Sequence, residues 1–464
     1  MSPAMNIQNT SAVLPNEILL YILLLVCGWF SEDPCTFYLR RHFLMEIDAY
    51  WKTLIGEDIH FWKGIFIDRD SRVQDVCAAV ERSKESQVHI YIAPGHSEPE
   101  DPFNADWDIR FRLLAGALDP IMNRCRQLTL KTSELEIDPV VLWLVSLPTT
   151  SLQTLNLQML PGTLFCSMVT SIGHSLVARG GWGWTVLDPA PSRYRPLRLL
   201  PNATITSLSI QHSFVLFEPA FLHGVTHLRL GPILEDILVS WDNICDLLQS
   251  CLPLTFLFLD DVRCKTQCAD FRTCFLPRLT HLRLFAVHEC CTRMLPAFDL
   301  PSLRVLDFEA ATQPDQADAV SLLTCQRFLA RVQHLTLSVD VPFAQALVAE
   351  LQPLAAMCHL DMRYSNPVTV LALEHLADCV GGPLCPQLRT IHLSAKPNPQ
   401  GISRILNNRV QGHFHPNCVL SYDFTDGIKG RTRVSYCAGS DTISTVDYVE
   451  LPDGGIESRE IFLN

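Results

Sequence analysis

A short pattern of two apolar residues separated by one residue constrains this chain more than any other feature. It has the form x-Leu-x-Leu and occurs ten times between residues 127 and 393. Successive copies start 20 to 31 residues apart, except for one interval of 53 between the second and the third copy. The ten copies are Gln127–Leu130, Thr154–Leu157, Ser207–Ile210, His227–Leu230, Phe256–Leu259, His281–Leu284, Val305–Phe308, His334–Leu337, His359–Met362 and Thr390–Leu393.

Each copy of the pattern predicts one β-strand, because residues at i and i+2 of a strand point to the same face. One strand per repeat cannot bury its apolar face alone, so neighbouring repeats are expected to stack into a parallel sheet. Parallel strands need a crossover between them, and several of the intervening segments have a helical pattern. The expected crossover helices are Leu234–Cys251, Ala317–Val332, Phe343–Met357 and Val368–Val380.

The interval between the copies is typical of leucine-rich repeats, whose period is about 20–29 residues. Because the interval of 53 is about twice this period, we expect one degenerate repeat near Trp184–Leu187. The common pattern has Asn or Cys three residues after the last leucine of the strand, and none of these repeats has either residue there. Residues 109–407 are therefore predicted to form an irregular α/β solenoid with a parallel sheet inside and helices outside.

The residues that alternate with the buried leucines are expected to face outward from the sheet, where repeat proteins usually bind their partners. Arg229 and Arg283 are expected to flank Phe258 from neighbouring repeats, an arrangement that resembles a binding hot spot. The alternative is an ordinary solvated strand face. The predicted substrate-binding residues are Arg229, Phe258, Arg283, Asp307 and Asp361.

The segment before the repeats has a helical pattern. A first helix is expected to begin at Leu14-Pro15, since proline suits the first helical turn, where its missing N–H costs nothing. A second helix is expected over residues 37–54, and a third short element contains Phe61, Trp62 and Ile65. A helix over Val73–Ser83 and a strand over Val88–Ile92 follow.

This segment resembles an F-box. The family begins with Leu-Pro-x-Glu-Leu/Ile-Leu, which matches residues 14–19, and it has two tryptophans eleven residues apart, which match Trp51 and Trp62. Asp48 stands where the family usually has Cys, and Ile59 where it often has Pro. The resemblance implies a three-helix unit that binds a Skp-type adaptor of a cullin-RING ubiquitin ligase. The adaptor contacts that it implies are Leu14, Pro15, Ile18, Ile22, Ile47, Trp51 and Trp62.

The resemblance therefore implies a non-catalytic substrate receptor of an SCF-type ligase, whose repeats hold a protein substrate. The alternative is an interaction scaffold with a degenerate F-box that does not bind an adaptor. An enzyme is the third hypothesis, but the sequence has no G-x-S-x-G, phosphate-binding, H-E-x-x-H or dinucleotide-binding motif. We predict no catalytic residue and no cofactor.

Two groups of residues are candidate metal ligands. Histidine recurs at one repeat position, and neighbouring strands could place His334 beside His359, but a structural zinc site takes four ligands. The second group lacks the paired C-x2-C spacing of zinc sites. It consists of Cys264, Cys268, Cys274, Cys290 and Cys291. We predict no metal site.

Composition excludes other classes of partner. The net charge is −13 without a Lys/Arg cluster, which argues against nucleic acid. The apolar run Ile18–Phe30 is shorter than the roughly 20 residues that span a bilayer. The 18 cysteines are scattered, and no leader pattern precedes Leu14, so we expect reduced thiols and a cytoplasmic or nuclear location.

These patterns divide the chain into five regions. Residues 1–13 are expected to be a flexible N-terminus, 14–66 the F-box-like unit, 67–108 a helix–strand connector with an acidic loop, and 109–407 the repeats. Residues 408–464 alternate like antiparallel strands at 419–422, 433–436 and 445–451. Because terminal repeats must hide their edge, this last region is expected to be a β-rich cap.

Overall fold

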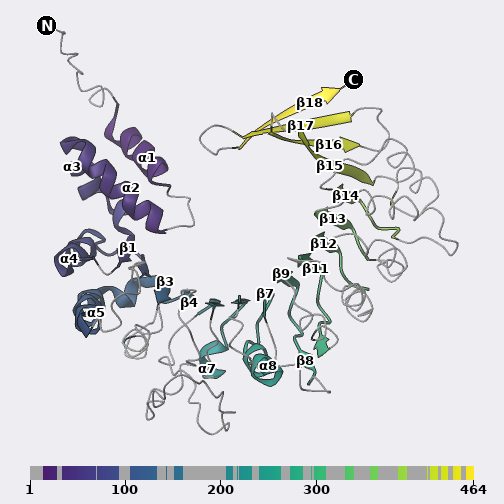
Figure 1. The fold of residues 1–464 in the computed structure, drawn as a ribbon, viewed down its shortest axis with the longest axis horizontal. Helices are drawn as coiled ribbons and strands as arrows, with labels where there is room; N and C mark the ends of the chain where they lie inside the picture. Colours follow the sequence, from purple (N-terminus) through teal and green to yellow (C-terminus); the bar gives the residue numbers. More distant parts are fainter. Residues whose placement is uncertain are drawn as a thin grey trace, which may run out of the picture. The chain divides into compact units, whose positions relative to one another are not determined.

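The chain folds into two compact units, residues 1–224 and 225–464. The computed structural model describes residues 14–28, 34–68, 70–93, 105–132, 143, 151–159, 205–212, 217, 219–232, 240–262, 272–285, 294, 297–309, 330–338, 356–363, 385–393, 415, 418–426, 430–436, 443–450 and 456–463. Helices and parallel strands occur in both units, which confirms the α/β class (Figure 1).

The first unit begins with a helical segment. Its elements are α1 (Asn16–Cys27), α2 (Pro34–Ile47), α3 (Ala49–Glu57) and the 3₁₀ turn η2 (Ile59–Trp62). Gly28 ends α1 in the left-handed conformation, at φ 80°, and its N–H donates to the carbonyls of Leu24 and Leu25.

The single second helix that the sequence predicted over residues 37–54 is two helices in the structure. Asp48 separates them because its carboxylate caps α3, accepting hydrogen bonds from the N–H groups of Tyr50 at 2.6 Å and Trp51 at 3.3 Å. An extended residue whose side chain replaces the missing helical acceptors starts a new helix at that point.

Five parallel strands follow in the first unit. They are β1 (Gly64–Ile67), β2 (Val88–Ile92), β3 (Cys125–Thr132), β4 (Thr154–Met159) and β5 (Ser207–Gln211). The helices of this part are α4 (Val73–Arg82), α5 (Ala105–Leu118), η3 (Asp119–Arg124) and α7 (Pro219–Leu222). The predicted helix at 73–83 and strand at 88–92 are confirmed, whereas α5 begins inside the predicted acidic loop.

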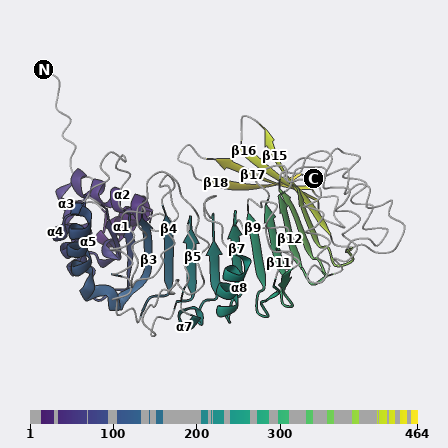
Figure 2. The ribbon, with the colours of Figure 1, turned by 60° about the horizontal axis from the view of Figure 1, so that its bottom comes forward.

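The described part of the second unit is built on eight parallel strands, and neighbouring strands lie side by side in Figure 2. The eight strands are β6 (His227–Leu230), β7 (Phe256–Asp260), β9 (His281–Phe285), β11 (Val305–Glu309), β12 (His334–Ser338), β13 (His359–Arg363), β14 (Thr390–Leu393) and β15 (Val419–Asp426).

All ten strands predicted from the x-Leu-x-Leu pattern are confirmed. The pairing keeps equivalent positions in line, so that Leu228, Leu257 and Leu282 are direct neighbours across β6, β7 and β9. These three leucines are at most 1% exposed. Burying a leucine side chain stabilises the fold by about 1.5–3 kcal/mol, so the repeated leucines form the core of the sheet.

The predicted degenerate repeat is wrong. β4 pairs directly with β5, with Leu155 opposite Leu208, so the sheet has no place for another repeat strand between them. Residues 184–187 themselves lie outside the described residues.

Among the predicted crossover helices, the segment 234–251 contains α8 (Trp241–Ser250). The other three fall almost entirely outside the described residues. Beside α8 lies a small parallel pair, β8 (Cys274–Phe275) with β10 (Phe298–Asp299). Figure 1 shows α8 and β8 on the same side of the sheet.

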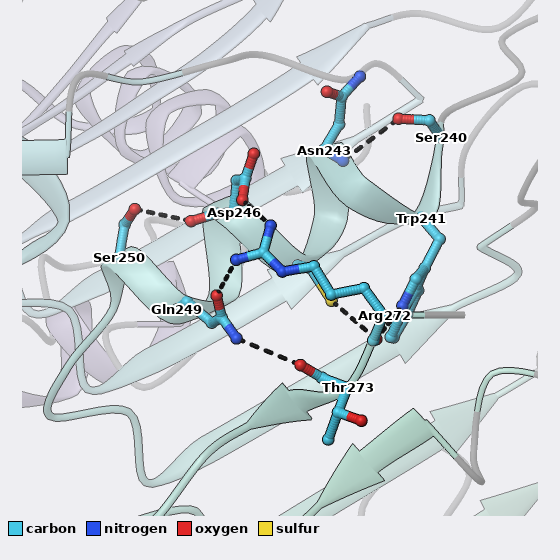
Figure 3. A network of polar contacts seen from close by, with 9 residues as sticks. Ser240, Trp241, Asn243, Asp246, Gln249, Ser250, Arg272 and Thr273 are labelled. Atoms are coloured by element: carbon cyan, nitrogen blue, oxygen red, sulfur yellow. Dashed lines mark hydrogen bonds and ion pairs between the residues drawn. The ribbon is translucent and has the colours of Figure 1, made fainter. Parts of the chain in front are cut away.

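A polar network fastens α8 to the segment that leads into β8 (Figure 3). The Arg272 guanidinium donates to the Asp246 carboxylate at 2.6 Å and to the side-chain oxygen of Gln249. The indole N–H of Trp241 donates to the Arg272 carbonyl at 2.7 Å. The Ser240 hydroxyl caps the helix, accepting from the N–H of Asn243 at 3.2 Å. The contacts of Arg272 hold α8 against the segment before β8.

The second unit ends in an antiparallel ladder. β15 pairs in parallel with β14 and in antiparallel with β16 (Gly430–Tyr436), which is followed by β17 (Ile443–Glu450) and β18 (Ile456–Leu463). The three predicted strand segments fall on β15, β16 and β17, and β18 was not predicted. The change from parallel to antiparallel pairing ends the repeat pattern.

Candidate functional site

Two surfaces of the molecule contain the residues singled out from the sequence. The first lies on the helical segment of the first unit, where ten large apolar side chains are 37–63% exposed. They are Leu14, Ile18, Tyr21, Ile22, Leu25, Val26, Leu39, Phe43, Ile47 and Tyr50. We call this set the apolar helical face.

The α1 helix is apolar on both sides, which explains how this face forms. Its inner side buries Leu19, Leu23, Leu24 and Cys27, each at most 5% exposed. The α2 helix packs against β1, where the ring of Tyr38 lies 5.0 Å from that of Phe66. Each helix therefore uses one side for the core and leaves apolar residues on the other, and exposed apolar patches of this kind mark interaction sites.

The seven predicted adaptor contacts divide into two groups. Five are exposed on the described surface of the helical segment, namely Leu14, Pro15, Ile18, Ile22 and Ile47. The two tryptophans are not: Trp51 is half-buried and Trp62 is 3% exposed.

Trp62 is an internal anchor of the first unit. Its indole N–H donates to the carbonyl of Ile55 at 2.8 Å. The guanidinium carbons of Arg41 and Arg82 lie 4.2 and 4.4 Å from the ring. The tryptophan therefore joins α2, α3 and α4, and it supports the apolar helical face from inside.

Arg41 is a buried structural residue that sequence reasoning missed. It is 2% exposed and donates to the carbonyl of Phe61 at 2.7 Å, with that of Gly64 at 3.5 Å. Burial lowers the pKa of Arg41 to about 10. The sequence offers little signal for this role, because Arg41 follows Arg40 and the pair has the appearance of an ordinary solvated pair.

The second surface lies on the outward face of β6, β7 and β9. Arg229, Phe258 and Arg283 occupy equivalent positions in the register. The guanidinium carbon of Arg229 lies 4.6 Å from the Phe258 ring centroid and that of Arg283 lies 5.0 Å from it. The predicted flanking arrangement is therefore confirmed. We call these three residues the arginine–phenylalanine clamp.

Two carboxylates that the sequence analysis did not select orient the clamp. Arg229 Nη2 donates to Asp260 Oδ2 at 2.8 Å, and Arg283 Nη2 lies 3.8 Å from Glu309 Oε2. Asp260 lies two residues after Phe258 on β7, and Glu309 lies two residues after Asp307 on β11. Side chains two residues apart on a strand point to the same face, so both carboxylates lie on the face of the clamp. The same alternation rule could have found them.

Asp307 lies next to the clamp, and Asp361 lies further away. Asp307 is opposite Arg283 in the register, and its carboxylate contacts His281 Nε2 at 2.8 Å. Burial alone would raise the pKa of Asp307, but hydrogen bonds from His281 and Thr336 outweigh it and hold the pKa below its usual value. Thr336 separates Asp307 from Asp361 in the same row.

The histidine pair expected from the repeat pattern is present. The rings of His334 and His359 stack with their centroids 4.2 Å apart. Within the described part of the chain, no group of three or more His, Cys, Asp or Glu side chains could hold a metal ion. Of the five cysteines considered as ligands, only Cys274 is described, and it is buried.

Neither a family model nor a curated protein matches the chain. No helix among the described residues is long and apolar enough to cross a membrane. The two surfaces offer apolar contact area and oriented charged groups, which are the means of protein recognition.

Proposed function

We propose that this protein is a non-catalytic substrate receptor of an SCF-type ubiquitin ligase. In this proposal the apolar helical face binds a Skp-type adaptor, and through it a cullin, while the repeat sheet holds a protein substrate. The observation that carries the proposal is the coincidence of two independent features. The segment that resembles an F-box in sequence is the segment in which ten large apolar residues are exposed among those described.

The proposed mechanism is proximity. A receptor of this kind performs no chemistry itself but holds the substrate near a ubiquitin-loaded enzyme, which converts a bimolecular encounter into an effectively unimolecular one. The antiparallel ladder β16–β18 would cap the end of the repeat sheet, since an uncovered strand edge invites pairing with other chains. Such a complex operates in the cytoplasm or the nucleus.

Co-purification with a Skp-type adaptor tests the proposal. The intact chain is compared with Ile18→Asp/Phe43→Asp, which places two charges on the apolar helical face where both residues are exposed. The matched control is Leu252→Asp/Phe275→Asp, which alters two similarly exposed apolar residues of the second unit. We expect the intact chain and the control to retain adaptor and the first variant to lose it.

Failure of the intact chain to retain more adaptor than Ile18→Asp/Phe43→Asp would overturn the ligase proposal. It would favour the alternative, an interaction scaffold with a degenerate F-box. The observation behind this alternative is that Trp62, which the family resemblance assigns to the adaptor surface, is buried within the chain. Circular dichroism of each variant confirms that it is folded.

A further inference from the structure

The arginine–phenylalanine clamp is an oriented set of hydrogen-bond donors. The side chains of Arg229 and Arg283 are 40% and 39% exposed, whereas those of Asp260 and Glu309 are 10% and 22% exposed. The carboxylates therefore lie beneath the guanidinium groups, and the guanidinium groups are what a partner meets first. Stacking on Phe258 fixes the plane of each group.

Among the described residues, most of the donors in the clamp have no acceptor. A guanidinium group has five N–H donors. For the two arginines together, the described residues provide one hydrogen bond, from Arg229 Nη2 to Asp260. The Nε–H of Arg229 is buried and out of a partner's reach. The Nη groups belong to side chains that are 40% and 39% exposed, so an acceptor of a partner can reach them.

The surroundings of the clamp add apolar area. Phe256 and Phe285 are half-buried on the same strands, and the Phe256 ring lies 4.7 Å from that of His281 and 5.8 Å from that of His227. An acceptor group flanked by an apolar side chain would therefore find complementary contacts. Aromatic and arginine side chains together are typical of interface hot spots.

We propose that the clamp binds a carboxylate of an acidic peptide segment in a protein partner. A carboxylate matches the planar fork of a guanidinium group and can accept two parallel hydrogen bonds from it. Each arginine already has one carboxylate beside it, so the four groups are together neutral. A doubly charged phosphate would meet more repulsion there than a carboxylate, and the long phosphate backbone of a nucleic acid would meet Asp307 as well.

The inference rests on the proposed function where it identifies the partner as the ligase substrate, but carboxylate binding can be tested without the adaptor. A random dodecapeptide library displayed on phage is selected on the full-length chain. The variant is Arg229→Gln/Arg283→Gln. The matched control is Arg304→Gln/Arg389→Gln, which removes the same charge from two exposed arginines of the same unit.

We expect peptides enriched in Asp or Glu next to an apolar residue to be selected by the wild-type chain and by the control, and to be lost with the clamp variant. Synthetic copies of a recovered peptide are then measured by fluorescence anisotropy. Replacing the acidic residue by Gln should weaken binding roughly tenfold or more, because the charge-assisted bonds are lost. Replacing it by phosphoserine should also weaken binding.

Recovery of no acidic peptides, or equal recovery by the clamp variant, would overturn the proposal. If the Gln peptide binds as tightly as the acidic peptide, the proposal is overturned without relying on any protein variant. If the phosphoserine peptide binds more tightly, the ligand of the clamp is a phosphate and not a carboxylate. Adaptor retention of the clamp variant is measured in parallel. Loss of peptide binding with normal adaptor retention separates this inference from the proposed function.

Discussion

Each unit of the molecule contains an aromatic ring with a guanidinium group on either side. The two sets are Arg41–Trp62–Arg82 in the first unit and Arg229–Phe258–Arg283 in the second. Their distances are similar, and their surroundings are not. The comparison shows how the same side-chain contact can stabilise a core in one place and form a binding surface in another.

Burial and the choice of acceptor make the difference. Arg41 is 2% exposed and donates to a backbone carbonyl. Arg229 is 40% exposed as a side chain and pairs with the carboxylate of Asp260. A buried charge stabilised by carbonyls and an aromatic face is costly to disturb, because the remaining groups lose their partner inside the protein. Arg229 remains accessible to a partner, whereas Asp260 is buried beneath it, at 7% exposed.

The largest expected effect is therefore that of removing the two rings. Trp62→Ala should lower the free energy of unfolding of the first unit by about 3–5 kcal/mol, because a large buried side chain is deleted and a cavity remains. Phe258→Ala should lower that of the second unit by less than about 1.5 kcal/mol, since its ring is only half-buried. Urea titration with hydrogen exchange of each unit measures both changes. Equal losses would show that the comparison is wrong.

Substitution of Gly231 tests whether the position of the Asp260 carboxylate depends on the close approach of the Gly231 and Asp260 backbones. Its φ is +100°, and a Cβ atom there would lie 1.7 Å from the backbone oxygen of Asp260. Gly231→Ala should cost about 3 kcal/mol, because the strained φ and the overlap both force the backbone of β7 to move. Thermal unfolding measures the loss.

Gly116 is the matched control for this substitution. It is an exposed helical glycine, and a Cβ atom added there would have no heavy atom within 4 Å outside its own helix turn, so Gly116→Ala should stabilise the chain by about 0.5–1 kcal/mol. If the two substitutions changed the thermal stability similarly, the close approach at Gly231 would not be what positions Asp260.

Conservative substitution of the arginines sharpens the comparison further. Arg41→Lys should lower the free energy of unfolding by about 2 kcal/mol, because an ammonium group cannot stack on Trp62 and reach the Phe61 carbonyl as the planar group does. Arg229→Lys should cost about 1 kcal/mol or less, because a lysine at this partly exposed position still places a positive charge beside Asp260. The two variants are compared by urea titration. A larger loss for Arg229→Lys would mean that the clamp is a structural element.

The sequence predicted the repeat strands well because their signal is local. Two leucines at i and i+2 define a strand face, and their recurrence defines the neighbours, so the contact of Phe258 with Arg229 and Arg283 followed from the pattern alone. Elements that depend on a single polar residue were missed. Asp48 appears in the sequence as one polar residue inside a helical pattern, and its capping role depends on its extended backbone.

The prediction of a degenerate repeat was wrong because it assumed that every interval between repeats has the same length. The 53 residues between the second and third copies were divided into two repeats, but β4 and β5 are direct neighbours. Burial of Arg41 was equally hidden, because it depends on α2, η2 and β1 meeting at one point. Interactions between distant elements leave no periodic signal in the sequence.

The smallest expected effect concerns the pH response of the repeat sheet, where His334 and His359 lie on β12 and β13, separated from the clamp by β11. Burial, then the neighbouring charges of His334 and Arg389, hold the pKa of His359 below its ordinary value of 6.5. The unfolded chain therefore binds this proton more readily, so the stability that neutral His359 contributes is present above pH 6.5 and is lost as the pH falls below it. The pKa of Asp307 is also lowered, so its contribution is lost only below about pH 4.

Urea titrations at pH 7.5 and 5.5 separate these windows, because Asp307 stays ionised at both values. The fall in unfolding free energy should be smaller in His359→Gln than in the wild type, by less than about 1 kcal/mol because solvent screens the partly exposed ring. The control is His223→Gln, which alters an exposed histidine outside the strands. The Arg41 set should not contribute, since a guanidinium with a pKa of about 10 keeps its proton throughout this range. If His359→Gln showed the same fall in unfolding free energy as the wild type, protonation of His359 would not affect stability. The exposed face would then contribute no more to the pH dependence of stability than the buried Arg41 set of the first unit.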